Sequence, residues 1–453
     1  MKFGGTSVGA AARIRTACDL IVRDAARRPV VAVVSAMSKI TDLLLDTTRH
    51  AEGDDQAGID NNLRQLEARH FEAAAELLPE SEQARVRAEI EELVAEFRRI
   101  VNGIQMLGHR PPRTVDEAVA AGEKLSALLV SEHLKARGVR AQAVNAAEVI
   151  VTDAVFNNAS PLMAATEKKA NERLRPLIEG GDIPIVTGFN GATADGRPTT
   201  LGRGGSDFSA SILASVLGAG ELWIWTDVDG IMTADPRLVP DAKILTEITY
   251  GEAAELAYAG AKVLHPRTLA PLVERRIPVW SKNSFAPEKP GTRIVPVLSA
   301  GNNGAHAVTS MAKVALVSLE PASSGVGGVH IMARSLEALD RANVEVLAVS
   351  SSSYRQSFCF LVREEELEVA TQAIEAALTL ELAHGYVREI DVDRNVGLLA
   401  VVGEGMRGFS GFAGRIFTAI SRENVNIIAI AQGSSELTIS IVVRRDGLEK
   451  AVR

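Results

Sequence analysis

The chain begins with MKFGGTSVG, a stretch whose residue types suit a phosphate group. Lys2 supplies one cation, and Gly4 and Gly5 leave backbone NH groups accessible. Thr6 and Ser7 add hydroxyl groups. The spacing matches neither a Walker A loop, GxxxxGK[ST], nor a dinucleotide-binding GxGxxG. We therefore expect a phosphate site of another kind at the front of the chain.

A second candidate for anion binding is TLGRGGSDFSA, residues 200–210. Arg203 offers a planar guanidinium that suits a carboxylate or a phosphate. Ser206 or Asp207 can cap the helix expected to begin here, and a helix start favours anionic groups. The alternative is that the glycines only make the turn and the aspartate only caps the helix. The glycines of this loop are Gly202, Gly204 and Gly205.

A turn with two carboxylates follows an apolar run in WTDVDGIMTADPR, residues 225–237. Asp227 and Asp229 come directly after a stretch with the pattern of a buried strand. Ligands of open α/β sheets bind at the carboxyl ends of strands, so this turn is a candidate ligand site. A solvated turn with aspartate side-chain hydrogen bonds is the alternative.

In GAKVLHPRT, residues 260–268, Lys262 beside a glycine is the better ligand candidate. His265 precedes a proline at a helix start, where a structural cap contact is more common than a catalytic base.

Hydroxyl groups and one carboxyl group complete the set of candidates. VSAMSKITDLL, residues 34–44, passes from a strand into a helix and carries Ser35 and Thr41. Glu123 lies on a helix, where a glutamate is usually solvated. Taken together, two glycine-rich loops, an acidic turn and several lysines suit phosphoryl transfer, in which positioning and charge neutralisation supply most of the catalysis.

These residues need a scaffold, and residues 1–300 have the alternating pattern of an α/β sandwich. The expected strands are β-branched and nearly continuous in apolar character, as in a parallel sheet buried on both faces. We expect strands at 30–37, 139–145, 183–191, 221–230 and 277–284, and helices at 10–27, 38–50, 114–137, 165–180, 206–218, 249–259 and 266–276. Residues 58–110 form a charged, amphipathic helical insertion.

The tail contains an internal repeat beyond a Pro- and Gly-rich boundary near 285–303. The stretch 325–353 returns as 405–436 at a constant offset of 81 residues. Each copy has the pattern strand, glycine-containing turn, helix, strand, turn, strand. This pattern predicts a paired module with related interfaces.

Bulk properties exclude several classes of protein. The 453 residues suggest about three domains at roughly 150 residues each. A net charge of -8 argues against nucleic-acid binding. Cys18 and Cys359 lie in apolar patterns, so we expect buried free thiols and a reducing compartment. Without a long apolar run or a signal peptide, the sequence predicts a cytoplasmic protein with no membrane partner.

The motifs KFGGTSV, LGRGGSD, TDVDGI.T.DPR and GAKVLHPRT, in this order, resemble aspartate kinases of the amino-acid kinase family. The repeat ending in IAIAQGSSE resembles their paired ACT domains. The resemblance runs nearly end to end and is closest to the kinase part of bifunctional aspartate kinase–homoserine dehydrogenase. It implies an αβα kinase domain with a mainly parallel sheet at 1–300, and two ferredoxin-like βαββαβ ACT domains at 301–390 and 391–453 that can interleave.

The resemblance also implies an activity. ATP would phosphorylate the β-carboxylate of L-aspartate, in the first step towards lysine, threonine and methionine. Mg²⁺ would arrive with ATP, because the sequence shows no dedicated protein metal site. An amino-acid effector, threonine or lysine, would bind the ACT domains, and these domains would form a homodimer or a larger homo-oligomer.

Roles for individual residues follow from the same motifs. Lys2 would neutralise charge on the transferring phosphoryl group, and Asp207 would orient Lys2. Arg203 would bind an aspartate carboxylate, and Glu123 would meet the substrate ammonium. The resemblance assigns nucleotide contacts to Lys2, Phe3, Gly4, Gly5, Thr226, Asp227, Asp229, Met232, Arg237, Lys262 and Val263, and substrate contacts to Ser35, Thr41, Glu123, Arg203, Gly204, Gly205 and Ser206.

Some positions depart from the family pattern. Only Met1 precedes Lys2, and Met232 stands where a tyrosine is common. Relatives that respond to threonine carry a glutamine in both ACT copies, whereas this chain has Ser351 in the first and Gln432 in the second. The candidate effector residues are Ser351, Gln432, Asn424 and Ser434. The alternatives are a monofunctional kinase, the kinase half of a bifunctional enzyme, a kinase for glutamate or acetylglutamate, and a non-catalytic amino-acid sensor.

Overall fold

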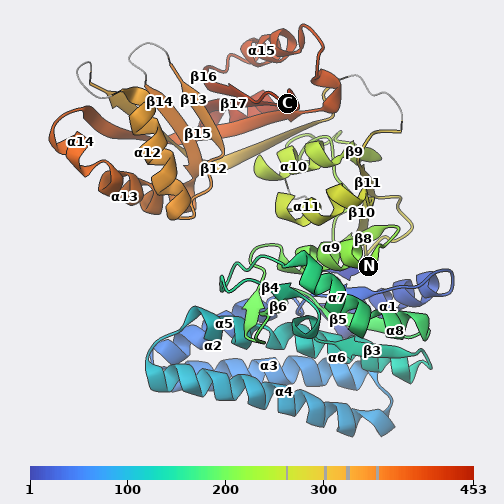
Figure 1. Ribbon diagram of the computed structural model, residues 1–453. Coiled ribbons are helices and arrows are strands. Elements are labelled where there is room, and N and C mark those ends of the chain that lie inside the picture. Colours follow the sequence, from blue (N-terminus) through green and yellow to red (C-terminus); the bar gives the residue numbers. More distant parts are fainter. Residues whose placement is uncertain (262–263, 300–303, 323–326, 353–356) are drawn as a thin grey trace. The chain divides into compact units, whose positions relative to one another are not determined.

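The computed structural model describes residues 1–261, 264–299, 304–322, 327–352 and 357–453 (Figure 1). By its contacts the chain divides into two compact units. The first unit comprises Met1–Ile231 and Arg267–Pro296, and the second comprises Met232–Pro266 and Val297–Arg453. Residues 232–266 thus group with the second unit, although they lie within the range 1–300 predicted for the kinase domain.

A mostly parallel sheet organises the first unit, as the continuous apolar runs predict. Its strands lie in the order β3-β5-β2-β1-β8-β10-β11. All neighbouring pairs are parallel except β10 and β11. The strand bounds are β1 (Lys2–Phe3), β2 (Ala32–Val34), β3 (Ala141–Val144), β5 (Ile183–Thr187), β8 (Leu222–Thr226), β10 (Val279–Asn283) and β11 (Thr292–Val295).

Helices cover both faces of this sheet. Successive strand residues point to opposite faces. Phe3 shares a core cluster with Ile14 of α1 and Leu125 of α6, so its neighbour Lys2 points to the other face. Helix α9 packs on β1, β2 and β8. The helices are α1 (Ala11–Ala25), α2 (Ile40–Glu52), α5 (Pro112–Val119), α6 (Ala121–Ala136), α7 (Met163–Arg173), α8 (Arg175–Glu179), α9 (Gly205–Leu217) and α11 (Pro266–Arg275).

The predicted insertion at 58–110 is a pair of helices, α3 (Gln56–Leu77) and α4 (Glu80–Leu107). The break lies at Leu78, whose extended backbone is the conformation favoured before a proline, here Pro79. Figure 1 shows α3 and α4 side by side. Both helices contribute side chains to the main core, including Leu63 and Val94, and α4 packs against α6.

A small second sheet leads into the arginine-bearing loop. Strands β4 (Val151–Thr152), β6 (Asn190–Thr193) and β7 (Pro198–Thr200) lie in the order β4-β6-β7. Strands β6 and β7 form an antiparallel hairpin. The chain leaves β7 at Thr200 and reaches α9 through Gly202–Gly204, so the hairpin fixes one end of that loop.

The second unit contains one antiparallel sheet in the order β13-β14-β12-β15-β17-β16. Helices of the two repeats pack with it. The bounds are β9 (Glu247–Thr249), α10 (Tyr250–Tyr258), β12 (Ala307–Pro321), α12 (Gly328–Arg341), β13 (Ala348–Ser351), β14 (Phe358–Arg363), α13 (Leu367–Ala377), α14 (Thr379–Ala383), β15 (Val387–Val402), α15 (Phe412–Arg422), β16 (Ile427–Gln432), β17 (Thr438–Arg444) and α16 (Leu448–Val452).

The predicted repeat is visible in this order, because β12-α12-β13-β14 is followed by β15-α15-β16-β17. The two long strands β12 and β15 pair with each other from Ala307↔Val402 to Pro321↔Val387. The first half of β12 lies beside the β15–β17 pair, and its second half lies beside β14. Each copy therefore takes an outer strand from the other, and the predicted boundary at 390/391 lies inside β15.

The described chain has two free cysteines, as predicted. Cys18 is buried, and burial raises its pKa to about 12. Cys359 is only partly buried, although its pKa is also raised by burial. In the described ranges, no helix combines the length and the apolar character that a membrane crossing requires.

Candidate active site

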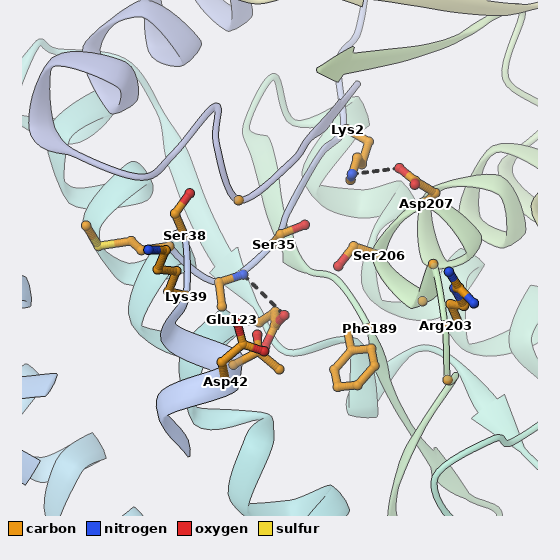
Figure 2. A pocket seen from close by; sticks show the side chains of 17 residues that line it. Lys2, Ser35, Ser38, Lys39, Asp42, Glu123, Phe189, Arg203, Ser206 and Asp207 are labelled. Carbon is orange, nitrogen blue, oxygen red and sulfur yellow. Dashed lines mark hydrogen bonds and ion pairs between the residues drawn. The ribbon is translucent and has the colours of Figure 1, made fainter. Parts of the chain in front are cut away.

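A pocket of about 500 Å³ lies in the first unit, where the loops after β1 and β2 meet the Arg203 loop and the start of α9. Its lining includes Lys2, Glu123, Arg203 and Asp207, which lie far apart in the sequence. Figure 2 shows Lys2, Asp207 and Ser206 close together along one side. The pocket thus brings together the two glycine-rich loops that the sequence analysis identified separately.

An ion pair joins the two predicted catalytic residues. Lys2 Nζ lies 2.6 Å from Asp207 Oδ1 (Figure 2). Lys2 is only 8% exposed, because β1 lies between β2 and β8. Asp207 lies in the first turn of α9, on the face of the sheet to which Lys2 points. Strand alternation and the packing of α9 therefore determine this contact.

The loop after β1 is shaped for close approach of a ligand. Gly4 N donates to the Trp225 carbonyl, and Ser38 N donates to the Gly5 carbonyl at 3.1 Å. A Cβ at Gly5 would lie 3.0 Å from the Ala36 carbonyl oxygen, so a side chain fits poorly there. Within the described part of the chain, the amides of Gly5 and Thr6 donate to no protein acceptor. They are available to bind phosphate oxygens.

Phe3, predicted to contact the nucleotide, has a fully buried side chain. Its ring stacks on Trp225 with centroids 6.2 Å apart. Only the backbone of Phe3 can therefore contribute to a ligand site.

The Arg203 loop depends on left-handed glycines. Gly202 has φ 73° and Gly204 has φ 69°, conformations that a residue with a Cβ adopts only with strain. Gly205 begins α9. Arg203 is exposed and lines the pocket, where its guanidinium can meet a carboxylate.

Glu123 is the most strongly perturbed carboxyl group of the pocket. It lies in the first turn of α6, is 3% exposed and accepts the Ala36 amide at 3.2 Å through Oε1 (Figure 2). Its Oε2 has no hydrogen-bond partner among the described atoms. Burial raises the pKa of Glu123 to about 8, although the Ala36 hydrogen bond opposes this shift. A cationic ligand would satisfy the second oxygen.

Three hydroxyl side chains predicted to bind substrate also line this pocket. Ser35 follows β2, and its amide donates to the Phe3 carbonyl. Thr41 lies in the first turn of α2, and Ser206 lies in the first turn of α9. All three line the pocket, as do Gly204 and Gly205.

The acidic turn lies at the carboxyl end of β8, as predicted. Asp227 is exposed, and its carboxylate accepts the Thr226 hydroxyl at 3.3 Å. Asp229 accepts Asn283 Nδ2 at 2.7 Å and pairs with Lys289 Nζ at 2.6 Å. The Lys289 ammonium holds the pKa of Asp229 below its usual range. Asp229 therefore ties this turn to the β10–β11 connection.

Two more of the predicted nucleotide residues belong to the second unit. Met232 belongs to the second unit and forms an isolated bridge with Ile244. Arg237, also in the second unit, is exposed and pairs with Asp235 at 2.6 Å. Lys262 and Val263 lie outside the described residues.

Two of the predicted effector residues, Ser351 and Gln432, occupy equivalent places in the two repeats. Ser351 ends β13 and Gln432 ends β16, and both are exposed. Asn424 has φ 56°, as Asn343 has φ 54° in the first copy, and each follows its helix at the position where a left-handed residue ends it. Asn424 thus has a structural role of its own. Ser434 is exposed in the turn after β16.

Other pocket residues escaped the sequence analysis. Lys39, Asp42 and Phe189 line the pocket, and Lys39 and Phe189 have positive φ angles of 65° and 70°. Such strain in non-glycine residues is concentrated at functional sites. Arg69 of α3 donates to the Ser38 carbonyl at 2.9 Å, so the insertion supports the loop after β2. The sequence does not predict the positive φ angles of Lys39 and Phe189, because neither residue type favours that conformation.

Comparison with known proteins supports this architecture. A family model described as the amino acid kinase family matches residues 1–283. A model described as an ACT domain matches residues 325–378 and 399–453. The chain therefore belongs to the amino acid kinase family. The chain thus combines a kinase-family region, which contains the Lys2–Asp207 pair, with ACT domains.

Within this family the chain is similar to aspartokinases. The aspartokinase of Schizosaccharomyces pombe is 30% identical over 487 residues, covering 100% of this chain and 90% of that protein. Escherichia coli aspartokinase III, solved in complex with aspartate and ADP, superposes with a TM-score of 0.84 at 31% identity, covering 100% of this chain and 97% of that one.

Longer proteins match as well. The bifunctional aspartokinase/homoserine dehydrogenase 1 of Zea mays is 34% identical over 459 residues, covering 100% of this chain and 49% of that protein. The chain thus spans about half the length of the bifunctional relatives.

Proposed function

We propose that this chain transfers the γ-phosphoryl group of ATP to the β-carboxylate of L-aspartate, giving ADP and 4-phospho-L-aspartate. The observation that carries the proposal is the Lys2–Asp207 ion pair, which lines the same pocket as Glu123 and Arg203. This pocket offers a cation for a phosphoryl group, a guanidinium for a carboxylate and a buried carboxyl group for an ammonium. An amino acid with an acidic side chain presents the complementary groups.

In the proposed reaction, a β-carboxylate oxygen attacks the γ-phosphorus, and the bond from that phosphorus to the oxygen bridging the β-phosphate breaks. Lys2 neutralises the charge on the transferring group, and Asp207 holds the Lys2 amine at 2.6 Å. The amides of Gly5 and Thr6 donate to phosphate oxygens. The attacking carboxylate is already ionised, so the reaction needs no general base.

Other residues of the pocket are the proposed contacts of the amino-acid substrate. Arg203 binds a carboxylate of aspartate through its two parallel NH groups. The substrate ammonium donates to Glu123 Oε2, the oxygen that has no hydrogen-bond partner among the described residues. The hydroxyls of Ser35, Thr41 and Ser206 complete the polar lining.

For the nucleotide, Thr226, Asp227 and Asp229 are the proposed contacts in the first unit, and Met232, Arg237, Lys262 and Val263 are proposed from their motifs alone. Mg²⁺ is the proposed companion of ATP. Among the described residues, no group of three or more His, Cys, Asp or Glu side chains could hold a metal ion. Phosphate oxygens and water would therefore supply most Mg²⁺ ligands, as is usual for this ion.

Regulation by an amino acid is the second part of the proposal. The chain carries ACT domains, and aspartokinase III of E. coli has been solved in complex with lysine and aspartate. We assign lysine or threonine as effector, with Ser351, Asn424, Gln432 and Ser434 as candidate contacts, and a homodimer or larger oligomer formed through the ACT domains. The reaction would begin the biosynthesis of lysine, threonine and methionine in the cytoplasm.

The similarity to bifunctional relatives favours one alternative, that this sequence is the kinase half of an aspartokinase/homoserine dehydrogenase. The reading frame downstream of Arg453 tests it directly. A dehydrogenase sequence there would establish the bifunctional form and leave the kinase assignment unchanged.

An ATP-dependent hydroxamate assay tests the activity. Aspartate should give the acyl-phosphate adduct, glutamate should give much less, and lysine or threonine should lower the rate. The Asp207→Asn variant is the matched control, because it keeps the size of the side chain and removes its charge. A preference for glutamate would overturn the substrate assignment. Absence of any turnover would favour an amino-acid sensor.

A further inference from the structure

The side chain of Arg203 is not fixed by polar contacts within the described part of the chain. Among the described residues its guanidinium makes no hydrogen bond or ion pair, and the side chain is exposed. Its place in the free protein therefore depends on the backbone from Leu201 to Gly205. Two of these residues, Gly202 and Gly204, have left-handed φ angles, so the loop needs support from its surroundings.

Arg267, the arginine of the GAKVLHPRT motif, supplies contacts to this loop from α11. Its Nη1 donates to Asn158 Oδ1 at 2.5 Å and to the Leu201 carbonyl at 3.3 Å. Its Nη2 donates to the Ala159 carbonyl at 2.7 Å and to Ser160 Oγ at 3.1 Å. One planar guanidinium thus joins the turn at 158–160 to the residue directly before Gly202.

The same side chain reaches the start of α9. The Arg267 guanidinium lies over the Phe208 ring, 4.9 Å from its centroid. Phe208 follows Asp207 in the first turn of that helix. Arg267 therefore touches both ends of the segment that carries Arg203 and Asp207.

The turn that Arg267 contacts, together with the preceding Asn157, packs directly against Gly202. A Cβ at Gly202 would lie 2.6 Å from Asn158 Oδ1, the atom that accepts from Arg267. Buried Asp116 holds the turn from the other side, since it accepts the Asn157 amide at 2.9 Å and the Thr200 hydroxyl at 2.5 Å. Gly202 therefore packs against a turn that Arg267 and Asp116 fix together.

We propose that Arg267 is a positioning residue for the Arg203 loop, fixing the backbone from which Arg203 reaches the substrate carboxylate. The identity of the ligand rests on the proposed function, whereas the support of the loop does not. Without Arg267 the loop samples other conformations, and part of the substrate's binding free energy is used to order it.

Amide hydrogen exchange tests the support without any reference to activity. Leu201 N donates to the Phe189 carbonyl and Gly205 N donates to the Gly202 carbonyl, both at 2.9 Å, so these amides report opening of the loop. In Arg267→Ala we expect both to exchange at least about tenfold faster, while amides of β5 keep their wild-type rates. Arg267→Lys keeps the charge but not the planar fork, and should exchange at an intermediate rate.

Arg28→Ala is the matched control, since Arg28 also lies 4.9 Å from a ring centroid, that of Trp223, and pairs with Glu221 at 3.1 Å. It should leave Leu201 and Gly205 unchanged. Wild-type exchange at both amides in Arg267→Ala, or equal acceleration throughout the first unit, would overturn the proposal.

Steady-state kinetics then tests whether the support acts through Arg203. Arg267→Ala should raise KM for the amino-acid substrate about tenfold and change kcat and KM for ATP less than about threefold. In an Arg203→Ala background the same change should add almost nothing, because the residue it positions is gone. Additive effects would refute action through Arg203. The cycle uses whichever acidic amino acid the wild type phosphorylates, so failure with aspartate would reject the proposed substrate and leave this test intact.

Discussion

Replacing Glu123 by glutamine should change how substrate affinity depends on pH. Glu123 is 3% exposed, and burial raises the pKa of its carboxyl group to about 8. At pH 7 the free enzyme therefore holds it mostly protonated. Binding of the substrate ammonium favours the ionised form, so binding below pH 8 releases a proton. KM for aspartate should fall about ninefold from pH 6 to 7 and about fivefold from pH 7 to 8, and should level off above pH 8.

The size of the effect follows from two terms. A hydrogen bond to a charged group contributes about 1.5–3 kcal/mol, so Glu123→Gln should raise KM about 10- to 150-fold at pH 8.5. At pH 6.5 the wild type must first ionise a group with pKa about 8, which costs about 2 kcal/mol at roughly 1.4 kcal/mol per unit. The gap between wild type and variant should therefore shrink to a few-fold at most.

The assay is initial-rate formation of the hydroxamate at saturating ATP, with aspartate varied at each half unit from pH 6 to 9. Glu132→Gln is the matched control. Glu132 is a second buried glutamate of α6, but it pairs with Lys135 at 2.7 Å and does not line the pocket. A wild-type KM that stays flat from pH 6 to 8 would refute the reasoning. So would a Glu123→Gln variant that keeps the wild-type slope.

Three other outcomes follow from the same site. Lys2→Met and Asp207→Asn should each lower kcat about a hundredfold or more in the hydroxamate assay, and the double variant should be little worse than either; normal kcat in one of them would reject the paired role. Arg203→Ala should raise KM for aspartate about 10- to 150-fold with KM for ATP unchanged, and an unaltered aspartate KM would contradict the carboxylate contact. Glu123→Gln should stabilise the free protein at pH 8, because a carboxyl group with a raised pKa in the folded state destabilises the protein as the pH rises from the unfolded-state pKa towards 8. Calorimetry should show a higher Tm for the variant at pH 8 and little change at pH 4. Equal Tm shifts at both pH values would contradict the burial argument.

Local patterns predicted much of this molecule. Continuous β-branched runs predicted β5 and β8, and the sequence motifs predicted the loops at their ends. Residue type and neighbouring glycines indicate Lys2 and Asp207 as candidate site residues. Their contact follows from strand alternation and from the packing of α9, and the structure places them 2.6 Å apart.

What the sequence could not predict depends on long-range packing. The strained backbones of Lys39 and Phe189 are imposed by neighbours distant in sequence, and neither residue type signals a positive φ. Burial of the Phe3 ring against Trp225 depends on which strand lies beside β1. The proposed role of Arg267 cannot be predicted without the tertiary contacts that bring residues 158–160 and Leu201 beside α11. No periodicity or spacing carries such information.

The pairing of β12 with β15 has a practical consequence for protein engineering. Because each repeat completes its sheet with a strand from the other, no single cut releases one repeat intact. A chimera that exchanges effector specificity with a relative must transplant the segment from β12 to α16 as one block. Mutations that destabilise one repeat should therefore also destabilise the other. A conformational change in either repeat should likewise affect both.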